Sequence, residues 1–387
     1  MMQFKDIIGQ AATKSKILQT IADNRLPHAI MLLGPEGNGS LAMALALTQI
    51  ILCENPTATD SCGTCSQCVK SQRMIHPDIH YMYPNIKRIP NDKEQLSSEW
   101  IKEWRQAIAT NPYINGIDWI NSLSNGENKQ GNITIGDCHN VIKKLSLKAY
   151  EAKYKVQIVW LAESLGPNSN SLLKIIEEPP ADTIFILVVE NIELILTTII
   201  SRTQIIKVPA VEDQDLQAGL IAQFNVQREE ARKIARVADG NYYLAMKMAD
   251  GEENTNDVLT LDLFKACMRK ALRNDIESVN NIQSVVARFA ELGRERQKNF
   301  IKYALFFLRE TMMLSNGMPS KLEGEEITYA QRFTPYLSTS KMQKIALFLD
   351  KLHYYIERNA NPKSQMLAFS IRMSNIIAEK EVEMVTY

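Results

Sequence analysis

Residues 29–41 read AIMLLGPEGNGSL. The first five residues form a short apolar run, and a glycine-rich turn from Gly34 to Gly39 follows it directly. The next segment, Leu41–Cys53, has the apolar character of a buried helix. A strand, a glycine-rich loop and a helix in this order present the backbone amides and the helix N-terminus that bind phosphate. The stretch therefore predicts an α/β core of the phosphate-loop (P-loop) NTPase type.

Two further apolar segments extend this pattern into a sheet. Val156–Leu161 follows a polar stretch, and Thr183–Val189 is almost entirely apolar and β-branched, as expected for a strand buried on both faces. Between them, Asn168–Glu178 predicts a helix that the following pair of prolines ends. Strands that alternate with helices indicate a parallel sheet. We expect this core to occupy residues 1–209.

The C-terminal part of the chain has a different character. Residues 210–252 predict short helices that would form a small lid domain, and the polar run Gly251–Asp257 resembles a linker. From 256 to 387, glycine and proline are sparse and helical periodicity persists, as in Phe300–Met313 and Met342–Glu357. This tail predicts an all-helical C-terminal domain.

A polar segment at about residues 86–131 stands apart and resembles an insertion into the core. It carries three of the four tryptophans, Trp100, Trp104 and Trp119. Trp100 and Trp104 are four residues apart and would share one face of a helix. That face either packs on its own domain, which is the more common arrangement, or docks a partner protein.

Length and composition limit the function classes. A chain of 387 residues exceeds one ordinary domain, so two or three are expected. The formal net charge is zero, which argues against a protein that binds nucleic acid alone through a dominant basic surface. No apolar run is long enough for a transmembrane helix, and the N-terminus lacks a signal-peptide layout. A cytoplasmic protein without a membrane partner is expected.

The phosphate loop lacks two residues that a working ATPase needs. An active loop reads G-x-x-x-x-G-K-[ST], in which the lysine neutralises phosphate charge and the hydroxyl binds Mg²⁺. The glycines are kept here, as Gly34, Gly37 and Gly39. Ser40 occupies the lysine position, and Leu41 offers no oxygen to a cation that requires oxygen ligands. We therefore expect a degenerate phosphate site that holds no ATP.

Two motifs after the later strands bear on the same chemistry. A working ATPase follows its second strand with an Asp-Glu pair, and here only Glu163 remains, after Ala162. The segment Leu196–Thr203 reads LTTIISRT and contains the pair Ser201 and Arg202. Arginine suits charge stabilisation on a transferring phosphoryl group, although an isolated Ser-Arg pair is more often an ordinary surface feature.

Four cysteines lie close together in the order Cys53-x8-Cys62-x2-Cys65-x2-Cys68. Four thiolates in one short segment match a closed, structural zinc site with tetrahedral geometry. A ferredoxin-type iron–sulfur run would continue with another cysteine, but residues 69–72 read VKSQ. The other two cysteines, Cys138 and Cys267, are expected to be ordinary buried thiols.

Taken together, these features resemble the clamp-loader branch of the AAA+ ATPases. The most specific match is the segment Asn170–Pro180, which reads NSLLKIIEEPP. The other matching stretches are Ile8-Gly9-Gln10, Leu26-Pro27-His28-Ala29, the loop from Gly34, the cysteine cluster, His76-Pro77-Asp78, Lys153-Tyr154-Lys155-Val156 and Ser201-Arg202-Thr203. In the last of these, Thr203 stands in place of the family's cysteine. The resemblance leaves 86–131 without a counterpart.

The resemblance implies an AAA+ core with a four-cysteine zinc module at residues 53–68, a lid, and a helical collar that joins subunits. In this family the Ser-Arg motif supplies an arginine finger in trans, which would make Arg202, with Ser201 beside it, part of a neighbouring subunit's ATP site. The family's lid carries a sensor arginine where this chain has Tyr243. Loss of this further nucleotide contact favours a non-hydrolysing, stator-like subunit.

The implied partners are other subunits of the bacterial DNA polymerase III clamp loader, namely the gamma/tau ATPase and delta. Through them the chain would act indirectly on the sliding clamp and primer-template DNA, and its implied cofactor is structural Zn²⁺ without ATP. One alternative is an active gamma/tau-like ATPase with a divergent phosphate loop, which ATP titration would reveal. Another is a separate DNA-binding zinc protein, which a steeply salt-dependent DNA affinity would reveal.

Overall fold

The computed structural model describes residues 2–88, 96–124, 129–251, 265–266, 276–292, 294–322, 324–358 and 360–378. The chain divides into two compact units, Met1–Glu253 and Asn254–Tyr387. Each unit has a hydrophobic core of its own, as expected of separate domains. Among the described residues, no helix is long and apolar enough to cross a membrane.

A five-stranded parallel sheet forms the centre of the first unit, in the order β2-β3-β4-β1-β5. Its strands are β1 (Ala29–Leu33), β2 (Ile79–Met82), β3 (Lys155–Trp160), β4 (Thr183–Val189) and β5 (Gln204–Lys207). β1 lies between β4 and β5, so the glycine-rich loop at its carboxyl end leaves the sheet between two neighbouring strands. β3 and β4 are buried along their whole length, which explains the nearly continuous apolar sequence of β4.

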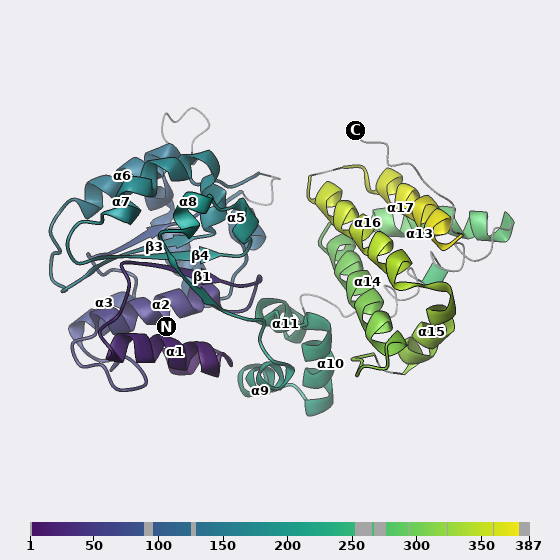
Figure 1. The fold of residues 1–387 in the computed structure, drawn as a ribbon, viewed down its shortest axis with the longest axis horizontal. Helices are drawn as coiled ribbons and strands as arrows, with labels where there is room; N and C mark the ends of the chain where they lie inside the picture. Colours follow the sequence, from purple (N-terminus) through teal and green to yellow (C-terminus); the bar gives the residue numbers. More distant parts are fainter. Residues whose placement is uncertain are drawn as a thin grey trace. The chain divides into compact units, whose positions relative to one another are not determined.

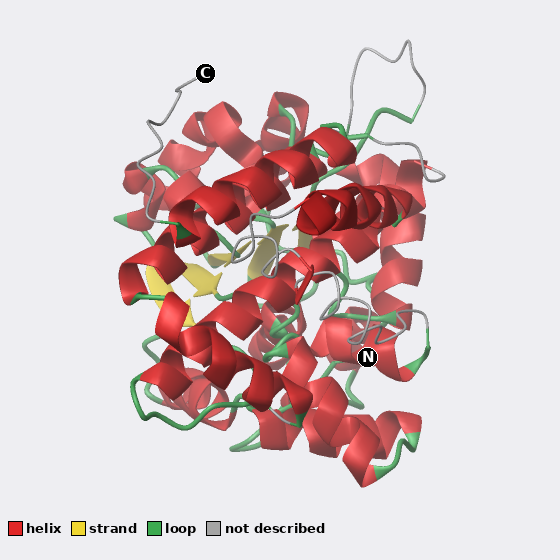
Figure 2. Ribbon diagram, turned by 90° about the vertical axis from the view of Figure 1, so that its right-hand side faces the viewer, coloured by secondary structure: helices red, strands yellow, loops and turns green. Residues whose placement is uncertain are grey.

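Helices cover both faces of this sheet, as Figure 1 shows, which confirms the predicted α/β fold. Figure 2 shows the strands in yellow and the helices in red. In Figure 1, α6, α7 and α8 lie on one face and α1, α2 and α3 on the other. The bounds of these helices are α1 (Ala11–Ala22), α2 (Ser40–Leu52), α3 (Ser66–Gln72), α6 (Ile135–Leu145), α7 (Leu173–Glu177) and α8 (Thr197–Ile200). Short 3-10 helices lie at η1 (Phe4–Asp6) and η4 (Ile192–Leu194).

The predicted helix Asn168–Glu178 is only partly α-helical. The 3-10 helix η3 (Ala162–Leu172) fills its first half, and the chain becomes α-helical only in α7. The backbone is non-helical at Gly166, and the Ser169 hydroxyl donates to the Gly166 carbonyl at 2.6 Å. Short serine side chains that bond to nearby carbonyls compete with the α-helical bonds of the backbone. The sequence therefore predicts the position of this element but not its type.

The segment 86–131 is part of the core of the first unit. It forms η2 (Ser97–Trp100), α4 (Ile101–Thr110) and α5 (Gly116–Ser124). Trp104 and Trp119 are fully buried, and their rings meet edge to face with centroids 5.2 Å apart. Tyr83, next to β2, stacks on Trp104 at 4.1 Å. The interpretation that the tryptophan face packs on its own domain is thus confirmed.

Three short helices follow the sheet and belong to the same compact unit. They are α9 (Asp213–Phe224), α10 (Arg228–Ala238) and α11 (Tyr242–Ala249), and we call them the lid helices. α11 begins at a capping residue, because the Asn241 side chain accepts a hydrogen bond from the Leu244 N–H at 2.9 Å. Figure 1 shows the lid helices as a small group beside the core.

The described part of the second unit is entirely helical. It contains α13 (Ile276–Glu291), α14 (Arg294–Ser315), α15 (Glu325–Phe333), η5 (Thr334–Tyr336), α16 (Thr339–Glu357) and α17 (Pro362–Ile377). Aromatic and aliphatic side chains such as Phe307, Leu349 and Phe369 form its core. The predicted thiol Cys267 lies outside the described residues.

The tryptophan cluster predicts a large effect on the stability of the first unit. We expect Trp104→Ala to lower its free energy of unfolding by about 3–5 kcal/mol, because a large buried ring leaves a cavity. Urea unfolding followed by tryptophan fluorescence measures this unit alone, since all four tryptophans lie in it. Exposed Lys102 on the same helix is the control, and Lys102→Ala should change stability by less than about 0.5 kcal/mol. Equal stability of the two variants would contradict the assigned core.

Candidate nucleotide pocket and cysteine cluster

The glycine-rich loop closes on itself through the side chain of Asn38. Its Oδ1 accepts hydrogen bonds from the Ser40 backbone N–H at 2.9 Å and from the Ser40 hydroxyl at 2.8 Å. Its Nδ2 donates to the carbonyl of Val208, just after β5, at 2.5 Å. Asn38 and Ser40 are both buried. The first amide of α2, a natural donor to phosphate, is therefore already bonded inside the protein.

Side chains from two other segments cover the same loop. A Cβ atom on Gly39 would lie 2.8 Å from Cε1 of Tyr113, and one on Gly37 would overlap the Asn241 side chain. The Tyr242 N–H donates to the Gly37 carbonyl at 2.9 Å. Both glycines have positive φ, at 72° for Gly37 and 92° for Gly39. Glycine at these two positions therefore allows the backbone conformation and also the close approach of other segments.

Tyr243, at the position where the family resemblance places a sensor arginine, binds a carboxylate of this chain. Its hydroxyl donates to Oδ2 of Asp118, on α5, at 2.5 Å. The Lys247 ammonium lies 2.6 Å from the same oxygen. The Asp118 and Lys247 side chains are only 24% and 23% exposed. Two side chains of α11 thus hold an anionic group supplied by the insertion.

The remaining acidic residue after β3 has a structural role. Glu163 accepts hydrogen bonds from the backbone N–H groups of Glu190 at 3.0 Å and Asn191 at 3.3 Å. Burial raises the pKa of Glu163, although these two N–H groups act in the opposite direction. Glu163 therefore fixes the turn that follows β4.

Arg202 and Ser201 lie just after α8. The Arg202 Nε and Nη2 atoms contact one carboxylate oxygen of Glu177, at 2.9 and 2.8 Å. Its Nη1 donates to the Thr198 carbonyl at 2.9 Å, and the Ser201 hydroxyl donates to the same carbonyl at 3.1 Å. The Arg202 side chain is 31% exposed and that of Glu177 is 53% exposed. The guanidinium is thus oriented by its own domain but remains accessible.

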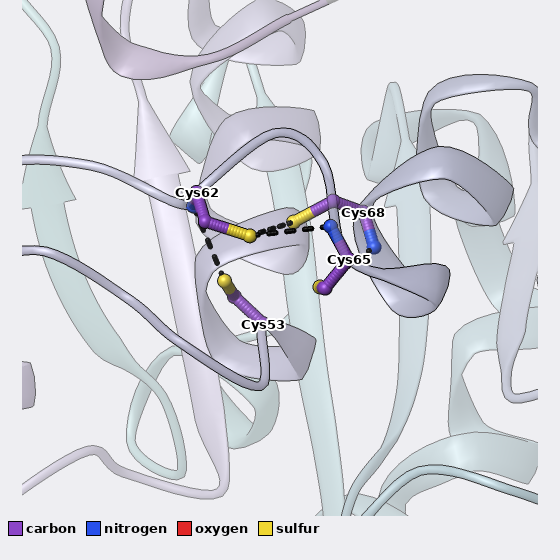
Figure 3. Close-up of side chains that lie close together, drawn as sticks. All are labelled: Cys53, Cys62, Cys65 and Cys68. Carbon is purple, nitrogen blue, oxygen red and sulfur yellow. Dashed lines mark hydrogen bonds between the residues drawn. The ribbon is translucent and has the colours of Figure 1, made fainter.

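The four clustered cysteines converge on one point, as Figure 3 shows. Their sulfur atoms all lie within 4.8 Å of one another, and the Cys62 and Cys68 sulfurs are 3.9 Å apart. Four sulfurs at about 2.3 Å from a central ion would be spaced by about 3.8 Å, so the arrangement fits a tetrahedral metal ion. Cys138 is buried but lies outside this cluster, on α6.

Backbone N–H groups donate hydrogen bonds to three of the four sulfurs, those of Cys53, Cys62 and Cys65. The N–H groups of Cys62, Cys65 and Cys68 each donate to the sulfur of the preceding cysteine in the cluster, at 3.2, 3.3 and 3.4 Å. Hydrogen bonds from the Thr64 and Cys65 backbones lower the pKa of Cys62 to about 6. Burial raises the pKa of Cys68. A bound cation would oppose the effect of burial by favouring the thiolates.

Neighbouring segments hold the cysteine cluster in place. The Asp60 carboxylate accepts the backbone N–H groups of Phe4 at 3.2 Å and Lys5 at 3.0 Å. His76, whose side chain is fully buried, pairs with Gln67 of α3 at 2.5 Å. His76 therefore supports α3 next to the cluster and is not among its four ligand candidates.

The structure also adds residues that the sequence did not single out. Asn38 could have been noticed, because an asparagine between two glycines often bonds to nearby backbone. Glu177 lies within the segment that carries the family resemblance, but nothing in the sequence pairs it with Arg202. Tyr113 and Asp118 lie in the segment 86–131, and neither belongs to a sequence motif that would mark it.

The family model described as "DNA polymerase III, delta subunit" matches residues 9–212. The chain belongs to this family. It is therefore a member of the DNA polymerase III clamp-loader family, as the sequence resemblance predicted. The matched region contains the glycine-rich loop, the cysteine cluster and the Ser-Arg pair.

Curated relatives of two kinds resemble this clamp-loader chain. DNA polymerase III subunit delta' is 25% identical over 238 residues in Bacillus subtilis and 21% over 240 in Escherichia coli, each match covering 61% of this chain. DNA polymerase III subunit tau of Bacillus subtilis is 20% identical over 382 residues, or 93% of this chain. The matches span only 58–59% of these relatives' lengths. Both kinds match comparably, so the choice between them depends on the site residues.

The cysteine geometry predicts one bound metal ion per chain. We expect metal analysis of the purified protein to find about one equivalent, and Cys68→Ala to lose it because a tetrahedral site then lacks one of its four ligands. Cys138→Ala, which removes a buried cysteine outside the cluster, is the matched control and should keep the metal. Unchanged metal content in Cys68→Ala would show that the cluster is not the site.

Proposed function

We propose that this chain is a non-hydrolysing, delta-prime-type subunit of a DNA polymerase III clamp loader. The carrying observation is that the Ser40 amide at the start of α2 bonds to Asn38 instead of remaining available to phosphate. The loop also lacks the lysine and the hydroxyl that compensate phosphate charge and bind Mg²⁺. Such a subunit would take part in loading the sliding clamp on primed DNA without turning over ATP itself.

The proposal predicts that the isolated chain does not bind ATP. We expect titration with a fluorescent ATP analogue in the presence of Mg²⁺ to give no saturation below about 1 mM, which corresponds to about 4 kcal/mol of binding free energy. The same titration without Mg²⁺ separates metal-assisted binding from non-specific association. Tight, Mg²⁺-dependent binding would instead support the second candidate, a tau/gamma-type ATPase with a divergent loop.

Arg202 is the residue proposed to act on a neighbour's ATP. Its guanidinium is one-third exposed and carries a charge suited to a transferring phosphoryl group. In the free subunit Glu177 holds it, so Arg202 would exchange this carboxylate for a phosphate when subunits meet. An exposed ion pair of this kind contributes little energy, about 0–1 kcal/mol, and would not prevent the exchange. Ser201 would help to hold the Thr198 carbonyl that orients Arg202.

Substitution of Arg202 tests this role in a reconstituted complex. We expect Arg202→Ala to lower ATP turnover at the adjoining site by roughly 10³-fold or more, as loss of an arginine finger does in GTPases. Arg202→Lys should also be impaired, because an ammonium cannot reproduce the planar fork. Exposed Arg25, just after α1, is the charge control, and Arg25→Ala should be unaffected. Full turnover with Arg202→Ala, in a complex of normal size, would remove the finger from the proposal.

The metal at the cysteine cluster is proposed to be Zn²⁺ with a structural role. Four thiolates leave no open coordination position, which is typical of structural rather than catalytic zinc. The cluster joins the end of α2 to α3, and Asp60 ties the same segment to the N-terminus. Zinc would therefore stabilise the part of the core where α2, the helix that follows the phosphate loop, ends.

The second unit is proposed as the collar that joins subunits. Exposed apolar side chains lie on α16 and α17, namely Leu347, Tyr354, Tyr355, Leu367 and Ile371. Apolar groups on neighbouring helices favour association with other helices. The proposed partners are the gamma/tau ATPase and delta subunits, with the sliding clamp and primer-template DNA reached through them. The chain would thus belong to a DNA-directed DNA polymerase holoenzyme without intrinsic ATPase activity.

A further inference from the structure

Residues 111–119, which we call the plug segment, connect the phosphate loop with the lid helices. The segment comprises the turn after α4 and the first residues of α5. It lies in the segment at about residues 86–131 that the sequence predicted to be an insertion. Tyr113 lies against Gly39 of the loop, and Asp118 bonds to Tyr243 of α11.

Tyr113 occupies the space directly over the phosphate loop. Its ring lies against Gly39, so closely that a side chain on that glycine would collide with it. Its hydroxyl accepts the Ile8 backbone N–H at 2.9 Å, and its ring meets that of Tyr242 edge to face at 4.9 Å. Tyr113 is 5% exposed. One buried side chain therefore joins the loop, the N-terminal segment and α11.

Asp118 supplies a negative charge at the other end of the plug segment. A single oxygen, Oδ2, accepts the Tyr243 hydroxyl and the Lys247 ammonium, both from α11. Hydrogen bonds between charged groups are shorter and stronger than those between neutral groups. The side chains of Asp118 and Lys247 are each about three-quarters buried. The contact has the chemistry of an anion site in which the anion is part of the chain.

The plug segment is itself rigidly supported. Trp119 is fully buried, and its Nε1 donates to the Pro84 carbonyl at 2.6 Å. The side-chain oxygen of Asn115 accepts the Asp118 N–H at 2.8 Å, which caps the start of α5. A Cβ on Gly116 would lie 2.6 Å from Leu161, so the segment packs tightly on the end of β3. Asp118 is thus held in position independently of the lid helices.

We propose that the plug segment is a built-in occupant of the nucleotide pocket that holds the lid helices on the core without ATP. Tyr113 takes the space over the loop, and Asp118 offers Tyr243 and Lys247 the anion that a nucleotide phosphate would otherwise supply. This inference rests on the proposed non-hydrolysing function and gives it a structural cause. A ligand shifts a conformational equilibrium only through different affinities for the two states. Because the plug segment already occupies this place, ATP would not bind one position of the lid helices more tightly than another. The lid helices would therefore keep the same position with and without ATP.

Hydrogen exchange of the full-length protein tests whether the plug segment holds α11 on the core, an arrangement that we call the latch. We expect the backbone amides of α11 to exchange equally slowly with and without Mg-ATP in the natural protein. Asp118→Asn keeps the size of the side chain and removes its charge, so opening of α11 should increase about tenfold. Tyr113→Phe, which removes only the hydroxyl bonded to Ile8, should produce a smaller increase at α11.

Asp23→Asn is the control for loss of one negative charge, because Asp23 lies exposed at the end of α1. In the Asp23→Asn variant, the backbone amides of α11 should exchange as slowly as in the natural protein. Unchanged exchange in Asp118→Asn, or protection of α11 by Mg-ATP in the natural protein, would overturn the latch. The latch and the arginine finger are tested separately. If hydrogen exchange contradicts the latch but the Arg202→Ala complex loses ATP turnover, the proposed non-hydrolysing role still stands. A functional latch with a fully active Arg202→Ala complex removes the finger instead.

Discussion

The side chain of Asn38 provides the bonds on which the proposed role of this chain depends. A helix N-terminus leaves several backbone N–H groups without partners, and these groups are what a phosphate loop offers to a nucleotide. Asn38 satisfies the first of them at Ser40 and simultaneously ties the loop to the end of β5 through Val208. The loop therefore keeps the backbone path of a phosphate site while its donor is used for folding.

The other polar groups around the pocket follow the same principle. Glu163 caps the turn after β4, and Asp118 receives the two polar side chains of α11 that face the insertion. Each of these groups that nucleotide chemistry would use has a partner within the protein. Arg202 differs, because its bond to Glu177 is half-exposed and open to exchange. This contrast is the physical basis for proposing that the chain contributes to a neighbour's reaction and not to its own.

The insertion connects stability with this arrangement. Its tryptophans enter the core beside Tyr83, and the same segment then carries Tyr113 and Asp118 to the pocket. Burial of large aromatic side chains gives the segment a fixed position, and a fixed position is what a carboxylate needs to serve as a lasting partner for Lys247. Beside the cysteine cluster, Asp60 ties the neighbouring part of the core to the N-terminal residues Phe4 and Lys5.

Local patterns in the sequence were sufficient to predict three of the five strands, the loop between β1 and α2, and the clustering of the four cysteines. Periodicity and spacing describe residues that are near each other along the chain, and these features are all of that kind. The same patterns predicted the wrong helix type at 168–172, where serine side chains compete with the backbone. Folding in three dimensions was needed to bring Asp118 to Tyr243 and Lys247, which are 125 and 129 residues away, and Glu177 to Arg202. Such pairs form where separate elements pack together, and no local pattern records which side chains will meet there.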